Sequence, residues 1–583
     1  MSTDVIADVV RPKARAVWLP TLRPSVPGVV LGIAAVVLLT VVGYPLLWLL
    51  LGAFGIPQEL TFSHLTKVVT DSRNIEPLLN TLILATGTGI GSVLLGVPLA
   101  WATARTNMPF GRVIHALVAL SFITPPYLTT LAYIILLGPN AGHLNRALRW
   151  LFPIKAGPID IFSMGGLIFV ITLHVFAFVY LLTHSALQTL DAPLEESAQI
   201  LGADRWTITR RVTLPLVAPA VTGGALLAAV ESLALFGPQA FLGSPAKIVF
   251  LPTRIYGTLG SYPPRLADAS ALSLLLVVLT IVGLTVQRRY LERRSFVTVA
   301  GRGVRTRTAR LGLWRWVLLA LCATVVLFSA ILPLAVLVAA AFSRSWTDLP
   351  TSANFTLRNF QTALFENQIA RRGIVNSFSL AFGAATITAV LGLLITYIDQ
   401  RTTMRGRRVL DYLAILPLGL PGTVLAVGMI QAFIRPPIQL YGTIWILLVA
   451  YIARFIPLAA RSASAALRQV DPSLEEAARI TNASWLQSIR LILAPLIRPG
   501  LLVAWLLVFI PALGELSATV LLYTSGTETI SVAIFRLNDL GQLEAVSALS
   551  VFMVAVILTM SLLLQWLTNR AGTPVARELP GGG

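Results

Sequence analysis

Two polar segments of similar sequence interrupt a chain that is otherwise strongly apolar. Residues 191–215 read DAPLEESAQILGADRWTITRRVTLP, and residues 471–495 read DPSLEEAARITNASWLQSIRLILAP. Each opens with an aspartate at a helix N-cap position, followed by two glutamates where the helix dipole favours negative charge. These glutamates are Glu195 and Glu196 in the first segment and Glu475 and Glu476 in the second. The spacing predicts a short helix with an acidic start in each segment.

The other residues of both segments favour docking to a partner protein. Ala198 and Ala478 lie on the apolar stripes of the two helices. Gly202 ends the first helix, because glycine adopts the left-handed backbone without strain; Asn482 stands at that place in the second segment, and asparagine is the next most tolerant residue. A short amphipathic helix that ends in a turn fits a partner's groove. The alternative, a helix lying on lipid headgroups, calls for Lys and Arg on its polar face, whereas both helices begin acidic.

Three ionisable residues inside apolar runs are candidates for a polar pathway, because charge is costly in a membrane and marks function there. Glu231 and Glu515 lie near the outer ends of the fifth spans, and His174 lies in a fourth span. The alternative for both glutamates is an interfacial carboxylate in contact with water, and for His174 a hydrogen bond between helices. Asn80 and Asn376 begin second spans, where we expect them to cap the helices.

The chain carries no nucleotide-binding loop of its own. A Walker A loop needs Gly-Lys before Ser or Thr, so that backbone N–H groups and a lysine hold the phosphates. None of the four lysines, Lys13, Lys67, Lys155 and Lys247, follows a glycine. We therefore expect no cofactor on this chain, and any ATP and Mg²⁺ on a partner ATPase. The histidines show no zinc-ligand spacing, and no nucleophile–base set is visible, which disfavours a metal site and a membrane enzyme.

The composition places these residues among membrane-spanning helices. The 583 residues are 56% hydrophobic and 12% charged with mean hydropathy +0.80, whereas soluble domains carry about 25% charged residues. Continuous apolar runs of this length predict helices that cross the hydrocarbon core and exclude a barrel. The predicted spans are roughly 28–54, 80–104, 113–138, 164–184, 214–237 and 267–287, then 316–343, 376–398, 409–434, 440–460, 494–514 and 543–566.

The twelve spans form two parallel repeats of six, because an even number of spans returns the chain to its starting side. Asn80, Gly96 and Arg105 recur as Asn376, Gly392 and Arg401, 296 positions later, and the offset falls to 280 beyond the third span. The predicted organisation is an N-terminal tail over 1–27, a first transmembrane domain over 28–287, a basic linker over 288–314, a second transmembrane domain over 315–566 and a C-terminal tail over 567–583. Pro125, Pro126, Pro417 and Pro421 are expected to kink the third spans, either along a pathway or for packing.

The net charge of +19 comes almost entirely from arginine and predicts the orientation of the chain. Basic residues gather on cytoplasmic loops, so both termini, the linker 288–314 and the two polar segments are expected in the cytoplasm of a multi-pass protein. The basic linker fits a solvated segment near anionic lipid, and no nucleic-acid partner is expected.

The two polar segments resemble a known signature. E-E-S-A-Q-I-L-G followed by L-P, and E-E-A-A-R-I-T-N followed by A-P, resemble the EAA motif of binding-protein-dependent ABC importer permeases, and both follow a fourth span of six, as in that family. GPNAGHLNR, SLALFGPQAFLGSPAKI with PTRIYGTL, and GELSATVLLYTSGTETISVAIF resemble stretches of the fused, two-domain ferric-iron permeases. The likeness covers nearly the whole chain, and Asn482 departs from the glycine usual at its position. Residues 191–215 and 471–495 are called the EAA segments below.

The resemblance implies an all-α ABC type I transmembrane-domain fold in the bacterial inner membrane. It implies that the EAA segments form coupling helices that insert into two copies of an ABC ATP-binding subunit. The residues that would carry this coupling are Glu195, Glu196, Ala198, Gly202, Glu475, Glu476, Ala478 and Asn482. An extracytoplasmic substrate-binding protein would deliver the cargo, and ferric iron is the cargo that the resemblance suggests.

Two alternatives stay open at this stage. An ion-coupled secondary transporter also favours twelve spans in two halves, but it calls for acidic residues near the membrane midplane, and the predicted spans place none there. Within the ABC permeases, thiamine, polyamines and aminoethylphosphonate are cargo alternatives to iron.

Overall fold

The computed structural model describes residues 26–152, 157–190, 192–293, 309, 311–348, 351–480 and 483–571. Every named element in these ranges is a helix, and the only bridges are two isolated ones. Ten helices are long and apolar enough to cross a membrane, and two bent pairs bring the number to twelve if each pair counts as one span. The predicted all-α membrane fold is therefore confirmed.

The spans of the first half are α1 with η1 and α2 (Val26–Leu38, Leu39–Gly43, Tyr44–Ala53), α4 (Ser72–Arg105), α5 and α6 (Gly111–Ile123, Pro126–Leu137), α8 (Met164–Gln188), α10 with η2 and α11 (Arg205–Ile208, Thr209–Thr213, Leu214–Ala234) and α13 (Leu266–Arg293). Those of the second half are α14 with η4 and α15 (Trp314–Val326, Leu327–Ile331, Leu332–Ala341), α17 (Gln368–Arg401), α18 with η6 and α19 (Arg407–Ile415, Leu416–Gly419, Gly422–Phe433), α20 (Ile444–Leu467), α22 with η7 and α23 (Trp485–Ser488, Ile489–Leu493, Ala494–Leu513) and α26 (Leu543–Ala571).

Shorter elements connect these spans. They are α3 (Ser63–Thr70), α7 (His143–Leu151), α9 (Ala192–Ile200), η3 (Gln239–Gly243) and α12 (Leu251–Leu259) in the first half. In the second half they are α16 (Arg358–Gln361), η5 (Thr362–Glu366), α21 (Ser473–Ile480), α24 (Thr519–Leu522) and α25 (Ile530–Asp539).

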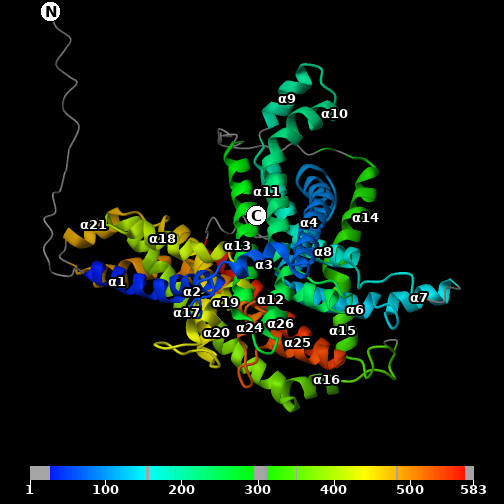
Figure 1. The fold of residues 1–583 in the computed structure, drawn as a ribbon. Helices are drawn as coiled ribbons and strands as arrows, with labels where there is room; N and C mark the ends of the chain where they lie inside the picture. Colours follow the sequence, from blue (N-terminus) through cyan, green and yellow to red (C-terminus); the bar gives the residue numbers. More distant parts are fainter. Residues whose placement is uncertain are drawn as a thin grey trace, which may run out of the picture.

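The first span of each half packs against the other half. Leu38 of α1 belongs to the same buried cluster as Leu380 of α17 and Ile446 of α20. Conversely, Val326 of α14 shares a buried cluster with Leu99 of α4. Figure 1 shows α1 and α2 lying beside α17 and α18, while α14 runs alongside α4 and α8. The two halves are thus held together by an exchange of their first helices.

Proline explains an irregularity that the first and fifth spans of both halves share. The π-turns η1, η2, η4 and η7 each end two residues before a proline: Pro45, Pro215, Pro333 and Pro495. Proline has no N–H to donate, and its ring clashes with the carbonyl of the residue four positions back. Widening that turn to the π pattern removes the clash without ending the helix. Four prolines therefore give the two repeats the same local geometry.

The third span of each half is broken rather than kinked. Helices α5 and α6 meet at 98°, and the helix ending at Gly419 meets α19 at 117°. Thr124 and Leu420, which precede Pro125 and Pro421, are extended, because the proline ring disfavours the helical region for the residue before it. Each of the spans predicted over 113–138 and 409–434 is therefore divided into two helices. Most of α6 and all of α19 are buried.

Two repeat-related glycines bring the long helices into backbone contact. A Cβ on Gly96 of α4 would lie 3.0 Å from the Phe176 carbonyl oxygen of α8, and a Cβ on Gly392 of α17 would lie 2.9 Å from the Ala460 nitrogen of α20. Small residues allow membrane helices to approach this closely. The recurrence of glycine 296 positions apart reflects the same helix crossing in each half.

Asn80 and Asn376 do not cap helices, contrary to the prediction. The helices begin earlier, and their N-caps are Asp71 and Asn367, whose side chains accept backbone N–H bonds. Asn80 Nδ2 instead donates to the Val249 carbonyl over 3.1 Å, and Asn376 Nδ2 donates to the Glu528 carbonyl over 2.8 Å. Each asparagine ties the second span of its half to the loop that follows the fifth span.

Candidate functional site

The EAA segments form short helices that end in equivalent turns. Helices α9 and α21 lie at two separate extremities of the molecule (Figure 1). Gly202 has φ +83°, which confirms its predicted left-handed turn. The Ala203 N–H donates to the Ala198 carbonyl over 3.0 Å, and the Ala483 N–H donates to the Ala478 carbonyl over 3.1 Å. Both turns therefore close with the same bond.

Parts of both EAA segments lie outside the described residues. Asp191, the predicted first N-cap, is among them, as are Asn482 and the side chain of Glu196. In the second segment, the Ser473 N–H donates to Asp471 Oδ1 over 2.8 Å, and this bond holds the pKa of Asp471 below its ordinary value. Asp471 thus caps the start of α21, as predicted.

The first carboxylate of α9 is anchored to the membrane domain. Arg105 Nη2, at the last residue of α4, donates to Glu195 Oε1 over 2.5 Å. Thr213 Oγ1 donates to the same oxygen over 2.8 Å. The side chain of Arg105 is 4% exposed and that of Glu195 is 13% exposed, so water screens this pair weakly. Glu195 joins α9 both to α4 and to the start of the fifth span.

The second EAA segment has the same anchor. Arg401, the last residue of α17, lies with Nε 3.4 Å from Glu475 Oε1, and Tyr397 Oη donates to Glu475 Oε2 over 2.8 Å. Arg401 Nη2 also donates to the Leu467 carbonyl over 3.2 Å and to the Val470 carbonyl. The side chains of Arg401 and Glu475 are 11% and 6% exposed. The arginines are 296 positions apart and the glutamates 280, so the ion pair is a property of the repeat.

The described residues predicted to couple to a partner therefore divide into two groups. Glu195 and Glu475 face the membrane domain, and Ala478 is buried while Ala198 is half-buried. Glu476 is exposed. Sequence reasoning did not find the arginine partners, although Arg105 and Arg401 were visible as repeated positions.

Large apolar side chains are exposed at the ends of the EAA helices. The C-terminal end of α9 carries Ile200 and Leu201, both 86% exposed, and α10 follows with Trp206 at 69%. At the end of α21, Ile480 is 83% exposed, and Leu486 of α22 is 63% exposed. Large apolar side chains that project together into water mark an interaction surface.

Caps fix the orientation of these apolar residues. Asp204 accepts hydrogen bonds from the Trp206 and Thr207 backbone N–H groups at the start of α10. The hydroxyl of Thr207 donates to the same carboxylate, and these bonds hold the pKa of Asp204 below its ordinary value. Ser484 and Gln487 form the capping box of α22, 280 positions after the cap of α10. The turn between the two short helices is thus set by side chains in each segment.

An ion pair between a half-buried arginine and a buried glutamate lies in the second half. Arg454 of α20 places Nε 3.7 Å from Glu515 Oε1, and the side chain of Glu515 is 3% exposed. Glu515 also accepts the backbone N–H groups of Ala518 and Thr519, each over 2.9 Å. A water-exposed interfacial carboxylate is therefore wrong for Glu515. Glu231 of α11, in the other half, is half-buried and lies in the electrostatic field of Arg454.

Interrupted helix ends from both halves meet around this ion pair. A Cβ on Gly422, at the break of the third span, would lie 2.7 Å from Arg454 Nη1. A Cβ on Gly237, just after α11, would lie 2.6 Å from Tyr127 Cβ, and one on Gly514 would lie 2.9 Å from Pro125 Cγ. Irregular backbone at membrane depth is tolerated where it is enclosed by protein or lines a cavity. The breaks of the third spans and the ends of the fifth spans therefore form one central region.

His174 serves helix packing. Its ring Nδ1 is 3.1 Å from the Ser121 carbonyl of α5, and the ring stacks on Phe122. The histidine is 7% exposed. Position 174 corresponds to Arg454, 280 residues later, so the two halves use one helix position differently. Among the described residues, no three His, Cys, Asp or Glu side chains are placed to hold a metal ion.

The family assignment rests on both halves of the chain. Residues 92–296 and 402–572 each match the family described as binding-protein-dependent transport system inner membrane component. The chain belongs to this family and is a fused permease with two copies of its transmembrane domain.

Similar proteins include permeases with different named cargoes. The chain is 26% identical to the ferric transport system permease protein FbpB of Actinobacillus pleuropneumoniae over 91% of its own length and 77% of that protein. It is 30% identical to the ABC transporter permease protein y4fN of Sinorhizobium fredii, covering 68% of this chain and 70% of that one. A protein of Salmonella paratyphi A named as the 2-aminoethylphosphonate transport system permease PhnV is 29% identical over 41% of this chain and 90% of its own length.

Proposed function

We propose that this permease couples to two ATP-binding subunits, one at α9 and one at α21. The observation that carries the proposal is the duplicated arrangement of a buried Arg–Glu anchor beside an exposed apolar end. Ile200 and Leu201 would enter the groove of one ATPase, and Ile480 that of the other. The EAA segments, both termini and the linker 288–314 would then lie in the cytoplasm.

The anchor supplies a route for force from the ATPase to the membrane. A subunit that moves α9 pulls on Glu195, and Glu195 is held to the end of α4 by Arg105. Helix α4 contains 34 residues, about 50 Å at 1.5 Å per residue, so its far end lies on the other side of the membrane. The pair Arg401–Glu475 does the same for α17, which also has 34 residues. Closure of two ATPases would thus turn two long helices together.

The substrate would pass through the central region where the helix ends meet. Glu231 approaches from the first half and Arg454 with Glu515 from the second, so a change in the angle between the halves alters their separation. Charged groups inside a membrane protein mark substrate pathways, and broken helices supply polar backbone to such a site. His174 has no part in this pathway in our proposal, because its hydrogen bond serves α5.

Ferric iron is the cargo we propose, delivered by an extracytoplasmic binding protein. The support is the likeness to the ferric transport permease, which extends over nearly all of this chain. A second candidate is 2-aminoethylphosphonate, since the likeness to PhnV covers 41% of the chain. ATP and Mg²⁺ would be bound by the partner subunits.

Reconstitution tests this function directly. The permease and its ATPase subunits would be reconstituted in liposomes together with the binding protein encoded beside the permease gene. The liposomes would be supplied with radioactive ferric iron or 2-aminoethylphosphonate. We expect iron uptake that requires ATP and the binding protein and is unchanged when the proton gradient is collapsed. Uptake driven by the proton gradient without any ATPase would overturn the proposal in favour of a secondary transporter. Accumulation of 2-aminoethylphosphonate but not iron would show that the phosphonate is the cargo. The proposed coupling to the ATPase subunits would then stand.

A further inference from the structure

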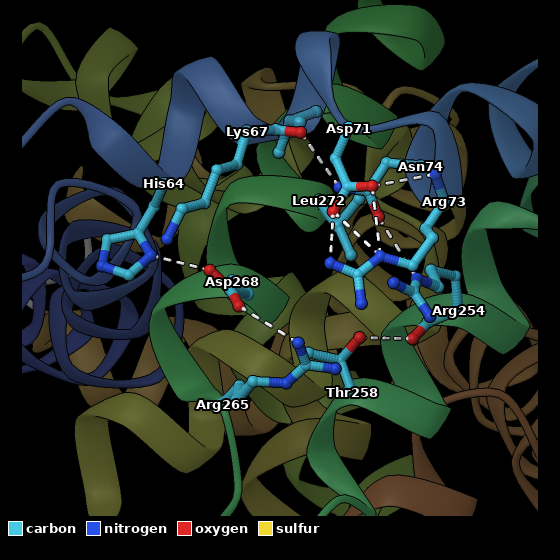
Figure 2. Close-up of a pocket in the computed structure, with 11 residues that line it drawn as sticks. His64, Lys67, Asp71, Arg73, Asn74, Arg254, Thr258, Arg265, Asp268 and Leu272 are labelled. Atoms are coloured by element: carbon cyan, nitrogen blue, oxygen red, sulfur yellow. Dashed lines mark hydrogen bonds and ion pairs between the residues drawn. The ribbon is translucent and has the colours of Figure 1, made fainter.

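A polar pocket lies at the end of α4 that is opposite the EAA segment. It is a cavity of about 160 Å³ between α3, the start of α4, α12 and the start of α13. Figure 2 shows its charged side chains converging from these four elements. Four cations line it, against two carboxylates: Lys67, Arg73, Arg254 and Arg265, with Asp71 and Asp268. The lining therefore carries a surplus of two positive charges before His64 is counted.

Both carboxylates of the pocket already form ion pairs with other residues that line it. Arg73 Nη2 lies 2.9 Å from Asp71 Oδ2. Asp268 receives His64 Nδ1 at 2.7 Å and Arg265 Nη1 at 3.8 Å. Neither carboxylate forms an ion pair with the third arginine of the pocket.

Arg254 is that third arginine. It is half-buried, and its Nε donates over 3.2 Å to Asn74 Oδ1, a neutral oxygen. Among the described residues, no carboxylate oxygen lies within 4.0 Å of its guanidinium. Burial and the positive charges of Arg265 and Arg73 lower the pKa of Arg254, and the negative charges of Asp71 and Asp268 offset this only in part. An added anion would relieve both the mutual repulsion of the arginines and the desolvation of Arg254.

The second half lacks the arginine and the asparagine of this pocket at the equivalent, described positions. Aligning Ile255 with Ile534 matches Arg254 to Ala533, and the 296-residue offset matches Asn74 to Ala370. The central arginine and its asparagine partner are thus both replaced by alanine. The pocket distinguishes one half of an otherwise repeated molecule.

The occupant must reach the pocket from water on this side of the membrane. Arg73 is 72% exposed and Arg265 is 45% exposed, so the rim is open while Arg254 lies deeper. A carboxylate on a docked protein surface gains from neighbouring contacts, whereas a small free anion must overcome the cost of association alone. Arginine forks match a carboxylate in geometry as well as charge.

We infer that this pocket receives a carboxylate side chain of the extracytoplasmic binding protein and thereby fixes which side of that protein faces the first half. The inference rests on the proposed function, because it requires a binding protein at the face opposite the EAA segments. The pocket and the Arg105–Glu195 anchor lie at the two ends of α4. Docking and ATPase coupling would therefore act on one helix.

A charge-matched pair of double variants tests the pocket. Arg254→Gln with Arg265→Gln removes two charges from the pocket, and Arg371→Gln with Arg372→Gln removes two exposed charges from the start of α17 in the other half. Each complete permease–ATPase complex would be held in nanodiscs, and its Kd for the neighbouring binding protein measured at low and high salt. We expect the pocket variant to bind about tenfold more weakly at low salt and to lose part of the salt dependence, while the control stays within about twofold. Unchanged yield and elution profile would show that each variant is folded.

Three results would overturn the inference. Equal weakening by both double variants would mean that a diffuse positive field, and no particular pocket, attracts the binding protein. Unchanged binding by the pocket variant, combined with loss of inorganic phosphate binding to it, would assign the pocket to a free anion. Failure of the unmodified complex to bind the binding protein at any salt would remove the proposed function itself, and this outcome is recognisable because it needs no variant.

Discussion

Arg105 and Glu195 are 90 residues apart in the chain, and Arg105 Nη2 donates to Glu195 Oε1 over 2.5 Å. Arg401 and Glu475 form the corresponding ion pair in the second half, with Nε 3.4 Å from Oε1. Removing one member of a buried ion pair leaves the other charge uncompensated, which costs about 3–5 kcal/mol in proteins. These pairs therefore decide how firmly the two EAA segments are held to the long helices.

Replacing Glu195 or Glu475 by glutamine is expected to uncouple ATP hydrolysis from transport. Glutamine keeps the size of the side chain but removes the charge that faces Arg105 or Arg401. Each variant should lower ATP-driven uptake at least about tenfold while the ATPase subunits still co-purify. Uptake and ATPase activity of the reconstituted complex would be measured together.

Glu476→Gln is the matched control for this prediction. Glu476 adjoins Glu475 on α21 but is exposed, so its loss should change uptake less than about twofold. Comparable losses in the Glu475 and Glu476 variants would show that charge on α21, and not the buried anchor, is what matters. Comparison of the Glu195 and Glu475 variants also measures whether the two EAA segments contribute equally.

Replacing an exposed apolar residue at the end of either EAA helix by serine should weaken the binding of the ATPase. Leu201→Ser just after α9 or Ile480→Ser at the end of α21 removes an apolar side chain that is 86% or 83% exposed, so the permease itself loses little packing. A side chain at the centre of an interface contributes about 2 kcal/mol or more to binding. We expect reduced recovery of ATPase in affinity purification. Trp150→Ser on α7, which is 85% exposed and far from the EAA segments, should leave recovery unchanged; equal recovery in all three would reject docking through these residues.

Removing the charge of Glu515 should impair transport without disturbing ATPase docking. Glu515→Gln keeps only one of the two oxygens that accept from Ala518 and Thr519, replaces the other by an NH₂ group and leaves Arg454 without its carboxylate. We expect uptake to fall about tenfold or more, because an unpaired buried charge alters the central region. His174→Gln, at the repeat-related position, should retain most uptake, since it bears on the α5–α8 contact only. Loss of uptake in the histidine variant alone would assign the pathway to the first half.

Enlarging either repeated glycine should destabilise the helix crossing. Gly96→Val or Gly392→Val places a side chain against the backbone of α8 or α20, and overpacking of this kind costs about 1–3 kcal/mol. The expected result is a lower Tm of the detergent-solubilised protein. Gly257→Val provides the control, because no atom lies within 4 Å of a Cβ built there. A Tm shift of the same size in that variant would show that valine lowers helix stability irrespective of contact.

Much of the fold could be predicted because the hydropathy of each segment and the spacing of repeated residues can be read directly from the sequence. The offset that relates Asn80 to Asn376 and Gly96 to Gly392 identified the duplication before any contact was known. Gly202 was predicted to be left-handed from its place at a helix end, and its φ agrees. These predictions depend on local conformation, which sequence spacing controls.

The sequence does not reveal contacts between residues that are distant in the chain. The interfacial alternative for Glu515 is excluded by such contacts, among them the one with Arg454, 61 residues earlier. The sequence singles out Glu195 but not its partner Arg105, because the third and fourth spans separate the two residues. The breaks at Pro125 and Pro421 exceeded an ordinary kink, since the preceding residue is also forced out of the helix. Recurrence of both Arg105 and Glu195 in the second half is the signal that could have paired them.

Because the first helices are exchanged between the halves, α1 is synthesised long before the helices that it packs against. Leu38 packs in the cluster that contains Leu380, and a ribosome needs on the order of tens of seconds to make the chain between them. During that interval α1 crosses the bilayer with its inward face turned to lipid or to an insertion factor. The order of translation thus runs against the order of packing, and the first helix to enter the membrane is among the last to find its final neighbours.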